Sequence, residues 1–375
     1  MLRVIVRSLC TRCQALPHPS LLSRPCSSSG PLENTETVDA LYDLSVDIQK
    51  IRQLKGWVLQ QSPAYVSQTA QLLRDLGAEG PVIARVLELF PEAVLCSPDE
   101  MLAQRELWSS LCPNPKDLVG IIEKFPASFF TSSCHHSNQR ENIVFFRSLQ
   151  LNRRVVAKLM ASAPQSFSRP VQHNQVMVKT LQEAYLELGG EEANMRVWLQ
   201  KLLSQNPFVL LKPPEVLREN LLFLSARGFS AAQLLRLLSK LRGFVTELNP
   251  HGMRLSLAYS QDKLACSDAD LQDIVLRCPA LLYFPEAVLE ERIQGLLGAG
   301  VSLAQIIQTP SVLELTPQIV SYRFQRLRAR GYNVGTGSLE VLNGTKKDFE
   351  ASYSKLQLRR DRPLFNPVAP LAGDD

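Results

Sequence analysis

The sequence predicts an all-α protein that forms one superhelical solenoid of helix–helix–3₁₀ repeats. Three observations support this prediction: a short turn on Pro or Gly recurs eight times, apolar residues at helical spacing flank each turn, and glycine often follows the second helical segment. A pair of short helices cannot bury its apolar face alone, so successive pairs are expected to stack on one another. We therefore expect mostly helix, essentially no β-sheet and one curved body.

The clearest repeat spans residues 267–300. Ser267 is an N-cap residue type, and Pro279 ends the first helix because a residue before proline is disfavoured in the α region. A tight turn follows, Pro285 suits the start of the second helix, and Gly298 and Gly300 suit its left-handed end. The apolar faces expected for the two helices are Leu271, Ile274, Val275 and Cys278, then Val288, Leu289, Ile293, Leu296 and Leu297.

The other repeats align on their turn residues, with spacings between 31 and 43 residues. Five second helices are predicted to end at a glycine, and the glycine-rich segment 331–337 is read as the loop after the last full repeat. The predicted turn residues are Gly56, Pro91, Pro126, Pro164, Pro207, Gly243, Pro279 and Pro310; the predicted terminating glycines are Gly77, Gly189, Gly228, Gly300 (with Gly298) and Gly331.

The N-terminal segment differs in composition from the rest of the chain. Residues 1–32 hold four arginines and no acidic residue, which is typical of a mitochondrial transit peptide; arginines interrupt the apolar run that a secretory signal would need. We predict a transit peptide over 1–35, a helical repeat domain over 36–370 and a short acidic tail over 371–375. The expected location is the mitochondrial matrix, and no apolar run is long enough for a membrane span.

Motifs for catalysis or metal binding are missing from the sequence. No phosphate-binding loop, dinucleotide fingerprint, nucleophile elbow or zinc-protease motif is present, so we expect no enzymatic activity and no cofactor. Cys134-His135-His136 lacks a second ligand pair at zinc spacing and is interpreted as a solvated loop, with no metal site. Five cysteines follow the predicted transit peptide, and they are expected to be free thiols in a reducing compartment.

Charge is distributed unevenly along the chain. The net charge of +5 divides into +4 for residues 1–32, −6 for 33–130 and +7 for 131–375. In the basic part, Lys and Arg recur at similar distances from the turns, so a solenoid would align them along one surface, which suits regularly spaced phosphates. Solvated helix faces are the alternative interpretation. The predicted nucleic-acid-binding residues are Arg154, Lys158, Arg169, Lys201, Arg218, Lys240, Arg242, Arg254, Arg292, Arg323, Arg326 and Arg328.

Repeats of this length, with a Pro-x-apolar-apolar turn, a leucine-rich second helix ending in Gly and a mitochondrial address, resemble the mitochondrial transcription termination factor family. The similarity covers about residues 36–370 and extends through longer segments at 46–59, 195–208 and 362–370. It implies a basic concave surface that binds double-stranded mitochondrial DNA, residence in the nucleoid and regulation of transcription by a monomer. Gly56 and Gly243 depart from the turn proline, which should alter local curvature.

Two alternative functions remain open at this stage. The resembling family includes members that act on ribosomal RNA in ribosome assembly, so ribosomal RNA is an alternative partner. A protein-binding scaffold, with nucleoid or transcription-machinery proteins as partners, is the other. None of the twelve predicted residues is assigned to base recognition.

Overall fold

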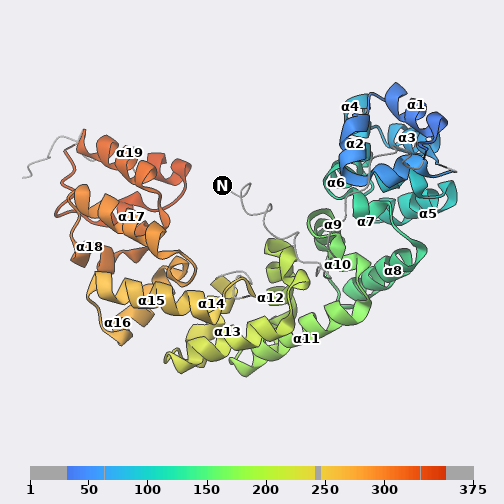
Figure 1. Cartoon of the computed structure of the whole chain (residues 1–375). Coiled ribbons are helices and arrows are strands. Elements are labelled where there is room, and N and C mark those ends of the chain that lie inside the picture. Colours follow the sequence, from blue (N-terminus) through green and yellow to red (C-terminus); the bar gives the residue numbers. More distant parts are fainter. Residues whose placement is uncertain (1–31, 63, 241–245, 330, 352–375) are drawn as a thin grey trace, which may run out of the picture.

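The computed structural model describes residues 32–351 except 63, 241–245 and 330. More than half of the described residues are helical, and this part of the chain contains no strand. The helices stack into an arc, with α1 (Thr35–Asp43) near one end and α19 (Pro317–Arg328) near the other (Figure 1). The all-α solenoid predicted from the sequence is therefore confirmed. In the described ranges, no helix is long and apolar enough to cross a membrane.

The first helices of the repeats form one row, here called the first-helix row. Most neighbours in this row contact one another, and each helix begins near a polar cap or a proline, as with the Asn152 side chain, which accepts a hydrogen bond from the Arg154 amide. The row comprises α2 (Ile48–Lys55), α4 (Gly80–Leu89), α6 (Pro115–Lys124), α9 (Arg153–Ser162), α12 (Glu192–Gln205), α14 (Ala231–Lys240), α16 (Asp268–Arg277) and α18 (Leu303–Gln308).

The second helices form a parallel row, the second-helix row, in which every helix contacts the next. Helix α1 heads this row, and no first helix precedes it within the described residues. The remaining members are α3 (Val66–Asp75), α5 (Pro98–Ser109), α8 (Ser133–Ser148), α11 (Val171–Glu187), α13 (Pro214–Ala226), α15 (Pro250–Leu264), α17 (Glu286–Gly298) and α19. The five predicted terminating positions Gly77, Gly189, Gly228, Gly300 and Gly331 all have positive φ, as a left-handed helix end requires.

Short turns join the two rows. They are η2 (Gly56–Gln60), η3 (Pro91–Leu95), α7 (Pro126–Phe129), α10 (Gln165–Ser168), η4 (Pro207–Leu211), η6 (Pro279–Leu282) and η7 (Pro310–Glu314); the turn predicted at Gly243 lies outside the described residues. The expectation of 3₁₀ geometry throughout was wrong for α7 and α10, which are single α-helical turns. The sequence analysis also missed a further turn, η8 (Leu339–Leu342), whose Leu339 and Leu342 are buried.

The core runs as a continuous layer between the two rows, from Leu41 in α1 to Phe349 beyond η8. In the repeat of residues 267–300, Ser267 caps α16 and forms a capping box with Asp270, and Leu271, Ile274, Val275 and Cys278 are buried as predicted. Most turns pack on the preceding second helix, as η6 does on α15. Stacked repeats thus share one core, which explains why no repeat needs a core of its own.

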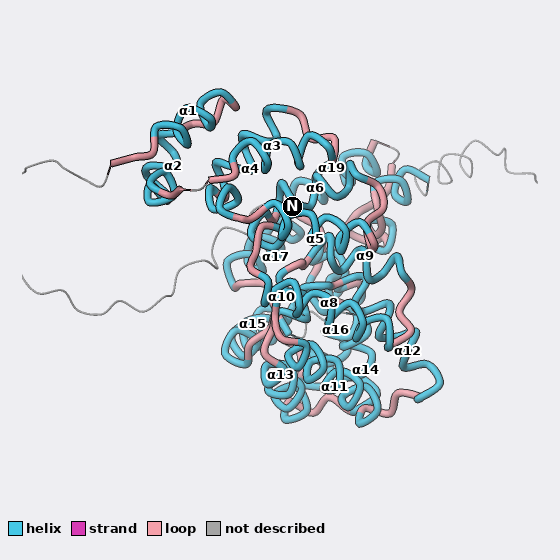
Figure 2. Tube along the Cα trace, turned by 90° about the vertical axis from the view of Figure 1, so that its right-hand side faces the viewer, coloured by secondary structure: helices cyan, strands magenta, loops and turns pink. Residues whose placement is uncertain are grey.

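The two rows have different positions in the arc. In Figure 1, α2, α4, α6, α9 and α12 lie on the inner side, whereas α3, α5, α8 and α11 lie on the outer side. Figure 2, turned by 90°, shows α9 and α12 toward one edge of the solenoid and α13 and α15 toward the other. Toward the C-terminal end, α16 and α18 lie on the outside in Figure 1, so the rows twist around the arc. The middle of the first-helix row therefore faces the hollow.

Candidate nucleic-acid interface

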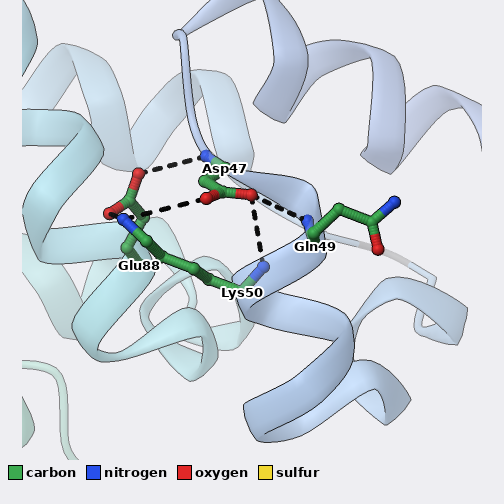
Figure 3. Close-up of polar contacts among 4 residues, drawn as sticks. All are labelled: Asp47, Gln49, Lys50 and Glu88. Carbon is green, nitrogen blue, oxygen red and sulfur yellow. Dashed lines mark hydrogen bonds and ion pairs between the residues drawn. The ribbon is translucent and has the colours of Figure 1, made fainter.

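Carboxylates neutralise the cations at the N-terminal end of the first-helix row. Lys50 of α2 lies 2.8 Å from a Glu88 carboxylate oxygen of α4 and 3.8 Å from Asp47, which also caps α2 (Figure 3). Arg85 of α4 pairs with Glu123 of α6 at 2.6 Å. These contacts hold neighbouring repeats together, and they leave little free positive charge on α2 and α4.

Helix α9 differs because it carries three cations and no carboxylate. The Arg153 guanidinium donates to the Ser110 carbonyl at 2.7 Å and so ties α9 to the end of α5. Arg154 and Lys158 are exposed, four residues apart on the same side of the helix. Within the described residues, no ion pair or hydrogen bond engages either charged group. The structure therefore leaves two cations of the predicted set free, both on α9, a helix on the inner side of the arc (Figure 1).

The neighbouring helix α6 adds two free cations that the sequence analysis missed. Lys116 and Lys124 are exposed, and their ammonium groups have no partner among the described residues. The adjacent carboxylates are occupied: Glu123 pairs with Arg85, and Asp117 accepts from the Asn114 amide at 3.0 Å. A groove of about 770 Å³ lies between α6 and α9 and is lined by these lysines together with Arg154 and Lys158.

Further along the row, α12 and α14 each present one free cation. Lys201 of α12 and Arg236 of α14 are exposed, and in the described part of the chain neither charged group has a bonding partner. Lys240 is exposed but donates to the carbonyls of Leu276 and Arg277, at 3.0 and 3.2 Å, so it joins α14 to the C-terminal end of α16. Lys201 thus remains a candidate for binding, whereas Lys240 has a structural contact.

The predicted set is divided between the two rows. Arg218 of α13 and Arg254 of α15 belong to the second-helix row, not to the inner surface of α6, α9 and α12. Arg218 pairs with Glu183 of α11 at 3.1 Å, and Arg254 lies over the Phe223 ring at 5.9 Å. Both are exposed, and their contacts link successive second helices. Arg218 and Arg254 therefore belong to a different row of helices from Lys158 and Lys201.

Arg323 is buried and Arg292 is half-buried, so neither is a freely exposed phosphate contact. Arg323 is only 5% exposed, donates to the carbonyls of Leu342 and Gly344, and lies over the Phe349 ring. Burial lowers the pKa of both guanidinium groups. The prediction that Arg323 contacts phosphates conflicts with these surroundings, because its guanidinium already donates to one carbonyl at the end of η8 and to another just after it.

Arg292 occupies the equivalent position one repeat earlier. It donates to the Leu313 carbonyl of η7 and stacks on Phe284, with 4.0 Å between the guanidinium carbon and the ring centroid. Its hydrogen bond thus connects α17 to the backbone of the following turn.

The remaining predicted residues have mixed surroundings. Arg169 is exposed and donates to the Leu211 carbonyl at 3.3 Å, Arg328 donates to the Ala299 carbonyl, and Arg326 lies 4.0 Å from Glu350. Arg242 lies outside the described residues. Three of these contacts connect one repeat with the next or with the C-terminal turn, so the nucleic-acid role predicted for these residues competes with a structural one.

The histidine-rich segment is not the loop that the sequence suggested. Cys134, His135 and His136 form the first turns of α8, and His136 is buried. The Nδ1 atom of His135 lies 2.6 Å from the Thr131 hydroxyl, and desolvation lowers the pKa of His136. Over the described ranges, no three His, Cys, Asp or Glu side chains converge in a way that could hold a metal ion.

Two comparisons place the chain among known proteins. The mTERF family model matches residues 38–350. Mitochondrial transcription termination factor 2 of Homo sapiens is 52% identical over 339 residues, covering 90% of this chain and 88% of that protein, and its Mus musculus counterpart is 48% identical over 363 residues, covering 95% and 94%. Mitochondrial transcription termination factor 1 of Homo sapiens is 28% identical over 334 residues, covering 88% and 83%.

Proposed function

The chain belongs to the mTERF family, and we propose that it regulates mitochondrial transcription by binding double-stranded DNA along the middle of its first-helix row. Its relatives are named mitochondrial transcription termination factors, which supports a mitochondrial role in transcription. The matrix and its nucleoid are the proposed location, in agreement with the arginine-rich, acid-free segment 1–32.

One observation carries the proposal: six cations without partners among the described residues follow one another along α6, α9, α12 and α14. They are Lys116, Lys124, Arg154, Lys158, Lys201 and Arg236, and all are exposed. A cation that already pairs with a carboxylate gains little from a phosphate, whereas a free cation releases condensed counterions when it binds one. The inner row therefore combines the position and the free charge that a nucleic-acid backbone needs.

A duplex fits this row better than an unpaired strand. Nonspecific binding of single strands depends on exposed aromatic rings on which bases stack. Along α6, α9, α12 and α14, Val197 is the only large apolar side chain that is mostly exposed, while Trp198 is partly buried and donates to the Ser239 hydroxyl at 3.0 Å. The described row thus supplies point charges without stacking platforms, which favours binding through phosphates and no enzymatic step.

The test compares two triple variants that remove the same charge from different rows. Lys158, Lys201 and Arg236 changed to Ala should lower the slope of log affinity against log salt by about 2.7, because each phosphate contact contributes about 0.9. Arg140, Arg147 and Arg218 of the second-helix row changed to Ala form the matched control and should leave the slope unchanged. Equal losses in the two variants would show that the interface is not the first-helix row.

The same binding assay separates DNA from RNA. A duplex from mitochondrial DNA and a structured ribosomal RNA compete for the full chain at fixed ionic strength. We expect the DNA duplex to be retained, because the deep, narrow major groove of RNA presents its phosphates differently. Preferential displacement by the RNA would favour ribosome assembly instead, and crosslinking in mitochondria followed by sequencing of both nucleic acids would identify the natural target.

A further inference from the structure

The groove between α6 and α9 concentrates the free charge of the first-helix row. Four of the six unpartnered cations line it: Lys116 and Lys124 on α6, and Arg154 and Lys158 on α9. The fifth cation at the groove, Arg153, is bonded to the Ser110 carbonyl. The single carboxylate in the lining, Asp117, is hydrogen-bonded to Asn114. The groove is therefore strongly cationic.

Residue spacing gives the groove two charged walls and a small-residue floor. Lys116, Gly120 and Lys124 recur every four residues and lie on one stripe of α6, as Arg154 and Lys158 do on α9. Gly120, Ala157 and Ala161 also line the groove, and a Cβ added at Gly120 would meet no heavy atom within 4 Å. Small residues between rows of cations let a ligand approach the helix backbones closely.

The dimensions of the groove suit a narrow, extended anion. Eight residues separate Lys116 from Lys124, which is about 12 Å along α6. Along the axis of a duplex each strand carries one phosphate about every 3.4 Å, so a length of about 12 Å covers three to four phosphate steps of one strand. Because α6 and α9 contact each other, the groove is a surface channel along two packed helices, in which an extended backbone can lie without a base pair entering.

We propose that the α6–α9 groove holds the sugar–phosphate backbone of one strand of bound nucleic acid, with its phosphates between the two charged walls and its sugars over Gly120 and Ala157. This inference rests on the proposed function and adds the place where the duplex is anchored. Lys201 and Arg236 then contact phosphates further along the duplex. The shared chemistry is a chain of phosphates, which a free polyphosphate could also supply.

The decisive variant is Gly120→Leu in the full chain, because it fills the groove and changes no charge. Its side chain extends into open space and replaces a helix-interior glycine, so the protein should be at least as heat-stable as the wild type. We expect its affinity for a DNA duplex at low salt to fall at least tenfold. Gly120→Ala is the matched control and should bind nearly as well as the wild type, because a methyl group leaves most of the groove open.

A charge comparison completes the test. Lys124→Ala with Lys158→Ala should abolish binding of tripolyphosphate and of a four-nucleotide single strand, whereas Lys201→Ala with Arg236→Ala should leave both unchanged. Each double variant should lower the duplex salt slope by about 1.8. Tighter binding of tripolyphosphate than of the tetranucleotide would assign the groove to free polyphosphate and contradict a role for the sugars.

The two hypotheses fail in different ways. If the wild type binds a duplex and Gly120→Leu binds it equally well, the groove inference is overturned while the proposed function stands. If the wild type binds no duplex, the proposed function is overturned, and so is the anchoring role of the groove; tetranucleotide binding then reports only on its phosphate chemistry.

Discussion

Arg323 and Arg218 both lie inside a second helix, α19 and α13 respectively, but they have different surroundings. Arg323 is buried and donates to two carbonyls beyond α19, whereas Arg218 is exposed and pairs with Glu183. Charge alone does not separate these residues in the sequence. Burial and the available acceptors decide that one stabilises the fold and the other lies on the surface.

Arg323→Ala should destabilise the protein and leave DNA binding unchanged. Removing a charged donor from two buried or half-buried carbonyls should cost about 2–3 kcal/mol. Arg218→Ala should change the free energy of unfolding by less than about 1 kcal/mol, because its ion pair is exposed. Chemical denaturation of both variants measures the difference. An Arg323→Ala protein with wild-type stability and reduced affinity would restore the phosphate-contact interpretation.

Ala265 is a second residue whose backbone is informative. It ends α15 with φ 48° and ψ 44°, in the left-handed region where Gly77, Gly189, Gly228 and Gly300 end other second helices. Ala265→Gly should therefore raise the free energy of unfolding by about 0.5–1 kcal/mol, since left-handed backbone is costly for a residue with a Cβ.

Gly77→Ala is the control for this prediction. A Cβ at Gly77 would meet no atom within 4 Å, so only backbone strain should lower its stability, by about 1 kcal/mol. Thermal melts of the two variants should shift in opposite directions. A loss of stability in Ala265→Gly would contradict the assignment of strain to this position.

At the scale of elements, the second helix of one repeat is tied to the turn of the next. The residue thirteen positions after the turn residue is polar in seven of the eight repeats, and six of these side chains donate to a carbonyl at or just after the following turn. These six are Thr69, Gln104, Asn220, Ser256, Arg292 and Arg323. A short turn leaves its last carbonyls without helical partners, so the preceding helix supplies the donors.

In two repeats, other side chains donate to the carbonyls of the following turn. Gln139 donates to the Ser168 hydroxyl at 3.1 Å, while Asn142 of the same helix donates to the Phe167 carbonyl at 2.9 Å. In the repeat of Pro164, position 177 is the buried Met177, and Arg169 instead donates to the Leu211 carbonyl. Basic residues at repeated positions can therefore connect one repeat to the next, so their recurrence does not require a bound ligand.

Gln139→Leu tests the polar contacts between repeats at the residue that makes several of them. Gln139 is fully buried; it accepts from Gln104 at 2.6 Å and from the Trp108 indole at 2.9 Å, and it donates to the Ser128 carbonyl at 2.8 Å. Leucine would leave the buried Trp108 indole without its acceptor and would leave Gln104 only its 3.3 Å bond to the Ser128 carbonyl, so we expect a loss of about 2–4 kcal/mol in chemical denaturation.

The matched control is the double variant Gln104→Leu with Gln139→Leu. Its loss should be smaller than the sum of the two single losses, because the side chains share one network. Additive losses would show that the two glutamines act independently.

At the scale of the whole molecule, the solenoid transmits stability only between neighbours. Each repeat contacts the next along the second-helix row, most do so along the first-helix row, and among the described residues no core joins the two ends of the arc (Figure 1). Local destabilisation should therefore remain local. This property distinguishes the chain from a globular domain of equal length.

Hydrogen exchange should show this locality. Gln139→Leu is expected to increase amide exchange in α5, α8 and α11 and to leave α17 and α19 close to wild type, whereas Arg323→Ala should show the reverse pattern. Each variant serves as the control for the other. Uniform acceleration throughout the chain would mean that the described repeats unfold as a single unit.

The sequence by itself determined the repeat, most of its turns and the glycines with positive φ. These features depend on local rules: proline stops a helix, glycine tolerates the left-handed region, and apolar residues at helical spacing form one face. The cap at Ser267 and the buried face of α16 follow from the same rules. The turn η8 was missed because it begins at Ser338 and Leu339 and has neither proline nor glycine at its start.

Only the tertiary structure decided which cations are free and which side of the solenoid carries them. The first- and second-helix rows are both amphipathic in sequence, and the twist of the arc determines that α6, α9 and α12 face inward. The acceptors of the bound cations come from residues 19 to 38 positions away in the sequence. They are the carboxylates and carbonyls that accept hydrogen bonds from Arg85, Arg218, Lys240, Arg292 and Arg323. Such distant partners depend on how repeats stack, so sequence spacing could align the cations but could not show which were already bound.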